Sequence, residues 1–304
     1  MKRAYTAGHF ELAIDGHKTT AYLKSVDGGM LKGNVIDEAH GADTVRMKHL
    51  SVVDIEPFSI DFGISGASDI LKWIQGSWKK EFSRRNGQVT HANFDIFGTY
   101  EHEFFDALIQ ETTFPALDGS ARDAAYMKIK VQPERIVSRK VKTGRLQPLM
   151  GQKQKMWLPS AFRLQLDGLE EELKYVNKIE SFTIKQGIKK FYTGEDRYPQ
   201  IEPTKIEFPN LTCTVALDYA EGLLTWHEKY VHSGNKDPSA QKTGTLEFLT
   251  PDRKSVNFAI KLFGVGIPNL QIQQSTANSD QIKRVKFELF VEHMELDGGA
   301  RGFE

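Results

Sequence analysis

The stretch FELAIDG at residues 10–16 nearly recurs as FRLQLDG at residues 162–168, half a chain away. Both stretches alternate apolar and polar residues, the period of a half-buried β-strand, and both end in Asp-Gly, a pair typical of turns. A strand-and-turn signal that occurs twice points to an internal repeat, which would decide the fold of the 304-residue chain.

The repeat extends beyond this stretch, because further apolar segments match in the same order and at nearly the same spacing. The matched pairs are DILKWI (69–74) with GLLTWH (222–227), FDIF (94–97) with LEFL (246–249), and FFDALI (104–109) with NFAIKL (257–262). In the first pair, Trp73 falls on Trp226. The conserved order predicts a tandem duplication, roughly of residues 10–136 onto residues 162–296.

Each copy is predicted to contain several strands and one helix. The segments EPFSIDFGI (56–64) and LTCTVALDY (211–219) are rich in β-branched and aromatic residues, which favour strands. Residues 65–82 and 220–234 instead carry apolar side chains at helical spacing. We therefore expect a mainly β (α+β) fold of two tandem antiparallel β-sandwich or barrel domains, with one helix in each.

The duplication sets the expected domain boundaries. The first domain would span residues 1–136, a basic linker residues 137–161, and the second domain residues 162–304. The linker carries six basic residues and no acidic one. It is either a solvated connection or a basic arm that docks on an acidic neighbour. In the second case its candidate assembly contacts are Arg139, Lys140, Lys142 and Arg145.

The composition argues against several classes of protein. Forty basic and forty acidic residues give a formal charge of zero, whereas a dedicated nucleic-acid binder usually carries a basic excess. Cys213 is the single cysteine, so no intrachain disulfide is possible and a reducing compartment is expected. The N-terminal MKRAYTAGHFEL lacks the apolar run of a secretory signal, and no stretch has the roughly 20 apolar residues of a membrane span. We expect a protein made in the cytoplasm, without a signal peptide and without membrane insertion.

No constellation of catalytic residues is evident. His227 and His232 lie five positions apart, so they do not share a helical face as metal-binding histidines on a helix do. Glu101-His102-Glu103 lies between strand signals with nothing to pair it to, and Cys213 lies in an alternating strand with no evident histidine partner. The chain is therefore predicted not to be an enzyme, with no catalytic, cofactor-binding or metal-binding residues.

Two parts of the sequence resemble a known family. The segments TGTLEFLTPDRKSVNFAIKLFGVGIPNLQIQQ (243–274) and DQIKRVKFELFVEHMEL (280–296) resemble the tail tube protein of contractile bacteriophages and phage-like injection particles. The segment GASDILKWIQGSWKKEFSRRNGQV (66–89) resembles the family's helix and the following hairpin, in a more divergent copy. The hemolysin-coregulated protein of type VI secretion is related to this family.

The resemblance implies a structural role. Six copies of the family's domain close into a ring by joining their sheets edge to edge, and stacked rings form a tube for DNA or protein cargo. Long hairpins contact the next ring, and their counterparts here would be residues 28–50 and 180–203. The second of these contains Lys189 and Lys190, which complete the candidate assembly contacts.

The duplication sets this chain apart from a one-domain tube subunit. Three chains would supply six domains in a pseudo-sixfold ring, whereas six chains would build a ring of double height. We expect a baseplate hub or tube-end adaptor that contacts neighbouring tube, hub or spike proteins. The alternatives are an ordinary tail tube subunit and a tandem β-sandwich binding module.

Overall fold

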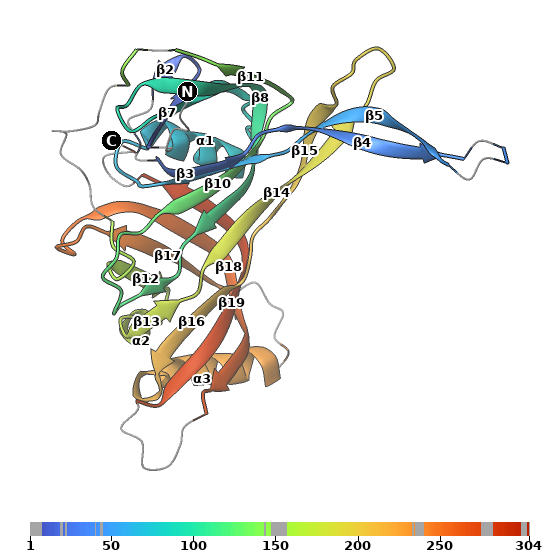
Figure 1. Cartoon of the computed structure of the whole chain (residues 1–304). Helices are drawn as coiled ribbons and strands as arrows, with labels where there is room; N and C mark the ends of the chain where they lie inside the picture. Colours follow the sequence, from blue (N-terminus) through green and yellow to red (C-terminus); the bar gives the residue numbers. More distant parts are fainter. Residues whose placement is uncertain are drawn as a thin grey trace.

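The computed structural model describes residues 8–18, 21, 23–39, 41–42, 45–142, 144–146, 157–232, 234, 240–274, 282–298 and 303. Within them the strands form a ten-stranded sheet, a seven-stranded sheet and a separate two-stranded hairpin (Figure 1). All strand pairs are antiparallel, and the helices pack against the sheets. The predicted mainly β fold class is thus confirmed.

The elements of the first half follow in this order. They are β1 (His9–Ile14), β2 (His17–Lys18), β3 (Leu23–Gly28), β4 (Leu31–Glu38), β5 (Met47–Ile55), β6 (Phe58–Phe62), α1 (Ser68–Trp78), β7 (Arg85–Ala92), β8 (Gly98–Phe114), β9 (Leu117–Asp118), β10 (Met127–Gln132) and β11 (Arg135–Lys140). Residues 137–140, which the sequence assigned to the linker, belong to β11 and pair with β8.

The second half repeats this order with variations. Its elements are β12 (Phe162–Leu166), α2 (Glu170–Leu173), β13 (Val176–Ile179), β14 (Phe182–Phe191), β15 (Gln200–Glu207), β16 (Leu211–Ala216), a 3₁₀ turn (Leu217–Tyr219), α3 (Glu221–His227), a π-helical turn (Glu228–His232), β17 (Lys242–Leu249), β18 (Val256–Ile272) and β19 (Arg284–Asp297). The one-turn helix α2 was not predicted. The predicted helix at residues 65–82 is shorter than expected, because Lys80 adopts a φ of 63° just after α1.

The strand registers of the two halves match. Ile14 of β1 lies opposite Gly87 of β7, and Leu166 of β12 lies opposite Gly244 of β17. A Cβ atom added at Gly87 would lie 2.5 Å from the carbonyl oxygen of Ala13, and one added at Gly244 would lie 2.1 Å from that of Gln165. Both positions therefore require glycine for the same reason, a close approach of the neighbouring strand.

The registers also correct the sequence matching. Gly87 lies opposite Phe104 of β8, and Gly244 lies opposite Leu262 of β18, so Phe104 corresponds to Leu262 and not to Asn257. Residues 94–97, matched to part of β17, form a turn in which Phe94 is 77% exposed. The matching fails because the connection between the helix and the next strand is longer in the second half, so one constant spacing cannot hold.

The two sheets share one continuous core. Trp78 of α1 is 2% exposed and packs against both Phe114 of β8 and Phe208 of the second half. Strand β14 of the second half also joins the sheet of the first half, beside β8 (Figure 1). The halves are thus joined by side-chain packing and by backbone hydrogen bonds, while the predicted domain boundaries stay a prediction.

Candidate assembly interface

The two halves of the chain join where β14 lies along the C-terminal part of β8, a contact that we call the seam. Residues 182–185 of β14 pair with residues 111–114 of β8. The hydroxyls of Thr113 and Thr183 lie 2.9 Å apart, and the rings of Phe114 and Phe182 stack with centroids 4.9 Å apart. Since both phenylalanines are buried, the seam combines backbone hydrogen bonds with apolar packing.

The hairpin β14–β15 makes further contacts beyond the seam. The carbonyl of Ile201 in β15 accepts a hydrogen bond of 2.6 Å from the guanidinium of Arg84, and its backbone N–H donates to the carboxylate of Glu134 over 3.3 Å. Lys190 forms an ion pair with Asp54 of β5. The side chain of Ile201 is fully buried, so this part of the hairpin is held firmly against the first half.

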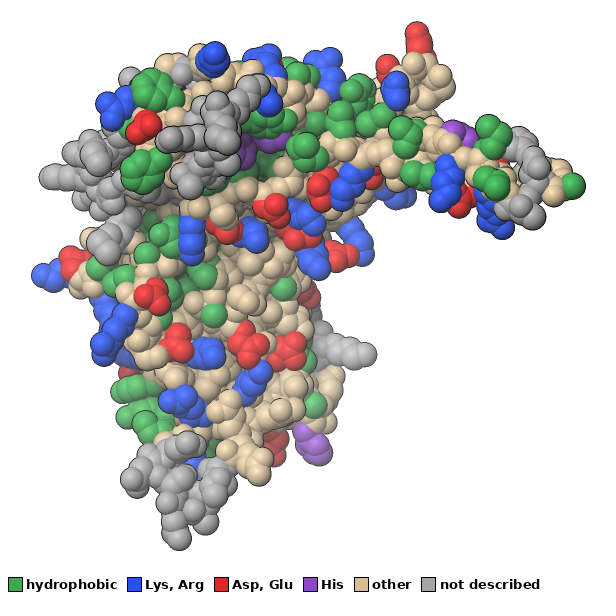
Figure 2. Space-filling model, viewed as in Figure 1, with side chains coloured by type: hydrophobic (Ala, Val, Ile, Leu, Met, Phe, Trp, Pro, Cys, Tyr) green, Lys and Arg blue, Asp and Glu red, His purple; other side chains and the backbone are tan. Residues whose placement is uncertain are grey.

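A second hairpin, β4–β5, is largely exposed, and every residue of β4 is on the surface. It projects away from both sheets (Figure 1), and its two strands pair only with each other among the described residues. Eight apolar residues in or beside it are at least two-fifths exposed: Met30, Leu31, Val35, Ile36, Val45, Met47, Leu50 and Val52. Figure 2 shows apolar side chains along this arm among charged ones. A folded chain rarely leaves so much apolar surface on two strands without a partner.

The basic residues predicted as assembly contacts lie in different settings. Arg139 of β11 donates to the carboxylate of Glu101 at 2.6 Å and lies 3.4 Å from that of Glu103. The side chain of Glu101 is only 4% exposed, so Arg139 balances a buried charge within the chain. Lys190 is likewise paired internally, with Asp54.

The remaining candidates are on the surface. Lys140, Lys142, Arg145 and Lys189 are all exposed. None of them forms an ion pair with the part of the chain that the structure describes. Lys153 and Lys155 of the predicted linker lie outside the described residues. A role of the basic residues in assembly therefore stays a prediction.

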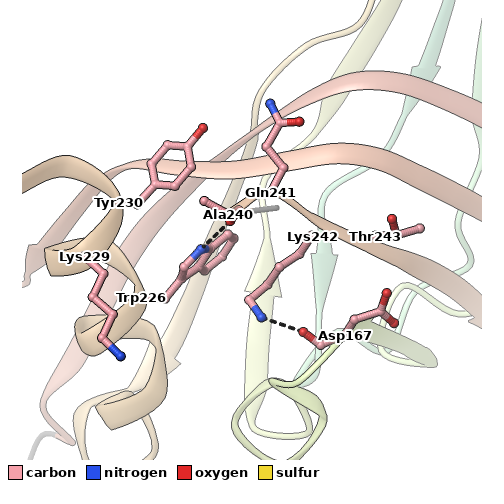
Figure 3. Close-up of a pocket in the computed structure, with 8 residues that line it drawn as sticks. All are labelled: Asp167, Trp226, Lys229, Tyr230, Ala240, Gln241, Lys242 and Thr243. Carbon is pink, nitrogen blue, oxygen red and sulfur yellow. Dashed lines mark hydrogen bonds between the residues drawn. The ribbon is translucent and has the colours of Figure 1, made fainter. Parts of the chain in front are cut away.

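A hollow of about 460 Å³ lies in the second half, between α3 and β17 (Figure 3). Its lining residues are Asp167, Trp226, Lys229, Tyr230, Ala240, Gln241, Lys242 and Thr243. The indole of Trp226 donates to the carbonyl of Ala240 over 3.2 Å, and the ammonium of Lys242 donates to that of Asp167 over 2.6 Å. These bonds are internal to the wall, so its polar groups are largely satisfied without a ligand.

The residues that the sequence considered for chemistry are not brought together. His227 ends α3 and His232 ends the π-helical turn after it, and no group of three potential metal ligands occurs among the described residues. Cys213 is fully buried in β16, where burial raises the pKa of its thiol far above the usual range. That the chain is not an enzyme stays a prediction.

Sequence reasoning missed one cluster of titratable groups. His91 of β7 and His102 of β8 lie with their rings 5.2 Å apart, and Tyr100 is 4.9 Å from His102. Burial lowers the pKa of His91, and it lowers the pKa of His102 together with the positive charge of His91. The ring nitrogen Nδ1 of His102 lies 2.8 Å from the hydroxyl of Ser138. The cluster fills space between strands and faces no cavity of substrate size.

No helix in the described part of the chain is long and apolar enough to cross a membrane. No family model matches the sequence, and no curated protein matches it. Solved structures do match. A chain from the sheath–tube complex of an extracellular contractile injection system (PVC), in its extended state, has 15% sequence identity and a TM-score of 0.41. The match covers 46% of this chain and 94% of that chain.

Two further solved structures are similar to part of this chain. A chain of the tube-terminating cap of the anti-feeding prophage has 11% identity and a TM-score of 0.39, covering 46% of this chain and 94% of its own. Hcp1 from Flavobacterium johnsoniae has 14% identity and a TM-score of 0.28, covering 46% of this chain and 96% of its own. Each of these matches covers less than half of this chain. The resemblance predicted from the sequence is confirmed at the level of the fold.

Proposed function

We propose that this chain is a structural component of a contractile phage tail or phage-like injection particle, in which it forms a ring of tube-like units around a central channel. The seam between β14 and β8 is the observation that carries the proposal. It joins two similar β units edge to edge inside one chain, which is the kind of contact from which a ring of such units is built.

The open edges support closure by further copies. A monomer exposes the apolar hairpin β4–β5 together with unpaired strand edges, and both are liabilities for a protein that stays alone in solution. A ring removes these edges, because each open edge is covered by the neighbouring copy.

Three chains per ring is the stoichiometry that we favour. Each chain supplies two tube-like units, so three chains supply the six units that the family resemblance implies. The two units differ on their outer surfaces, because the hairpin β14–β15 pairs with β8 whereas no further strand of the described residues pairs with the hairpin β4–β5. Such a ring would have threefold symmetry, which suits a hub or tube-end adaptor between a sixfold tube and a threefold spike.

The proposal is tested by electron microscopy of the purified chain at high concentration, with its mass measured by light scattering. We expect rings with a central pore and a mass three times that of one chain. A mass six times that of one chain would support the ring but would show that it contains six chains and not three. A chain that remains monomeric at every concentration, alone and with candidate tube or spike proteins, would refute the proposal.

A further inference from the structure

We propose that the hairpin β4–β5 of one copy adds to the free edge of β18 in the next copy, in the same register in which β14 adds to β8 within the chain. This inference rests on the proposed ring and names the surfaces that close it. Its occupant is a second copy of this chain, because the chain itself already contains one example of the contact.

The strands β8 and β18 present equivalent edges. Both strands have 17 residues, and Phe104 of β8 corresponds to Leu262 of β18 through their glycine partners. When both strands are followed from these two positions without a gap, Thr112 corresponds to Leu270 and Phe114 corresponds to Ile272. The C-terminal part of β18 therefore has the same place in its sheet as the part of β8 that forms the seam.

Only one of these two edges is covered. Residues 111–113 of β8 pair with β10 on one side, and residues 111–114 pair with β14 on the other. Residues 269–272 of β18 pair with β19 on one side, and no strand of the described residues lies on the other. Phe114 is accordingly 0% exposed, whereas Ile272 is 58% exposed. An unpaired strand edge that carries an exposed apolar side chain is a template for another strand.

The two hairpins β14–β15 and β4–β5 are also equivalent. Each shows a register shift at the same place, just after Gln186 in the pairing of β14 with β15 and just after Gly33 in the pairing of β4 with β5. Ile184 lies two residues before Gln186, and Leu31 lies two residues before Gly33, so Ile184 and Leu31 occupy equivalent positions in the two hairpins. Ile184 is 3% exposed beside β8, whereas Leu31 is 51% exposed. The free hairpin thus carries an apolar residue where the bound hairpin buries one.

These equivalences fix an expected register between copies. Within the chain, Thr183 lies opposite Thr113 and Ile184 lies opposite Thr112. Between copies, Met30 would lie opposite Gln271, and Leu31 opposite Leu270. The contact would cover the exposed side chains of Met30 and Leu31 and supply hydrogen-bond partners for the unpaired backbone of β18.

The hollow of Figure 3 fits the same arrangement. Arg84, which binds the carbonyl of Ile201 beyond the seam, corresponds to Gln241 in the wall of the hollow, by the register of β7 and β17. Ile201 itself corresponds to Lys48 of the free hairpin. With respect to the described residues, the hollow is therefore the uncovered counterpart of a surface beside β15, and β5 of the next copy would lie over it.

The outer part of the hairpin cannot repeat the contact in full. Within the chain, Lys190 forms an ion pair with Asp54. In the contact between copies, Asp37 would take the place of Lys190 and Glu207 that of Asp54, and both of these residues are acidic. The interchain contact therefore depends on the inner part of the hairpin, around Met30 and Leu31.

Engineered disulfides test the register. The double variant Met30→Cys, Gln271→Cys places two thiols opposite each other across an antiparallel pair, within the range that a disulfide spans. Leu31→Cys with Gln271→Cys is the matched control, because Leu31 is equally exposed but projects to the other face of the strand. The wild-type chain controls for Cys213, which is fully buried. Each single variant controls for pairing between identical positions.

On oxidation of assembled rings, we expect the Met30/Gln271 variant to form covalent oligomers that end at the closed ring, and the controls to remain largely monomeric in denaturing gels. Rings that assemble but give no more cross-linking in this variant than in the Leu31/Gln271 control would overturn the inference and leave the proposed ring in place. Absence of any ring in all variants would overturn both.

A second pair of variants does not depend on thiol chemistry. Leu31→Lys and Val45→Lys each put a charge on an exposed apolar position of the same hairpin region, so neither should affect the fold of the monomer. Val45 lies at the far end of the hairpin, away from the proposed contact. We expect Leu31→Lys to lose ring assembly and Val45→Lys to retain it, as measured by light scattering. Equal assembly by the two variants would contradict the proposed contact.

Discussion

Trp73 and Trp226 occupy equivalent places in the two halves of the chain. The indole of Trp73 in α1 donates to the carbonyl of Ser83 over 3.0 Å, and that of Trp226 in α3 donates to the carbonyl of Ala240 over 3.2 Å. In each half the helix is thereby tied to the residues that lead into the next strand. The sequence matched these two tryptophans directly, and the structure gives the physical reason for their recurrence.

Replacing either tryptophan by phenylalanine should destabilise the fold. Trp73→Phe and Trp226→Phe each remove one hydrogen bond that ties the helix to the following chain, worth about 0.5–1.5 kcal/mol. Trp73 is 3% exposed and Trp226 is 9% exposed, so Trp73→Phe should cost more because it also leaves a cavity. Chemical denaturation would measure both changes. Equal stability of both variants and the wild type would argue against this role of the indole groups.

The seam should contribute strongly to the stability of the isolated chain. Phe182→Ala removes a buried ring that stacks on Phe114, and we expect the free energy of unfolding to fall by about 3–5 kcal/mol. Phe191→Ala, in the same strand but 60% exposed, is the matched control and should change it by less than about 0.5 kcal/mol. Similar losses for the two variants, measured by urea denaturation, would show that the seam does not stabilise the chain.

The basic residues around β11 should divide into two groups. Arg139→Ala leaves the buried carboxylate of Glu101 without its cation, and should destabilise the monomer by about 1–3 kcal/mol. The triple variant Lys140→Gln, Lys142→Gln, Arg145→Gln changes only exposed side chains, so its melting temperature should match that of the wild type. If these residues contact a neighbouring copy or partner, the triple variant should still assemble less well, as measured by light scattering. Unchanged assembly would show that these three side chains are solvated surface charges that make no contact with a neighbouring copy or partner.

The histidine cluster should make stability depend on pH. The pKa values of His91 and His102 in the folded chain lie below the value of about 6.5 expected in the unfolded chain, because burial disfavours the charged ring. The unfolded chain therefore binds more protons below that pH. This part of the stability is fully present above pH 6.5 and falls as the pH is lowered toward the folded-state pKa values.

The double variant His91→Gln, His102→Gln should lose stability less steeply than the wild type between pH 7.5 and pH 5, as measured by thermal unfolding at each pH. His17→Gln, at an exposed position, is the control and should follow the wild type. Parallel pH profiles of the double variant and the wild type would contradict the assignment.

The elements that the sequence predicted well are those whose apolar pattern is complete within a short segment. The strands around Phe10 and Phe162 and the helices around Trp73 and Trp226 lie where periodicity placed them. The helix of the first half was predicted too long. A positive φ at Lys80 follows its end, and the periodicity of apolar residues gives no information about that angle. The turn at residues 94–97 was mistaken for a strand, because the two aromatic residues of FDIF resemble core residues although both are largely exposed.

The assembly interface could not be read from the sequence. The segment FTIKQGIKKF has the alternation of a strand, but nothing in it says that β14 pairs with β8 of the other half. Strand partners that are distant in sequence are set by the tertiary fold and not by local pattern. The positive charge of the linker drew attention to Arg139, whose partner Glu101 becomes visible only when β11 is placed beside β8. The apolar residues of β4 and β5 are visible in the sequence, but their exposure is not, because it arises from two strands that pair only with each other among the described residues.

The seam also has a consequence for synthesis on the ribosome. The sheet of the first half cannot be completed by the first half alone. One edge of β8 pairs with residues 182–185, which are synthesised later. While those residues are still inside the exit tunnel, the nascent chain presents a strand with one unpaired edge, which ends in Phe114, a side chain that is fully buried in the finished fold. Polysomes bring several such nascent chains close together, and exposed edges of this kind favour pairing between chains. Slow translation between residues 114 and 182 would thus promote misassembly, and a chaperone bound to the emerging first half would be the natural remedy.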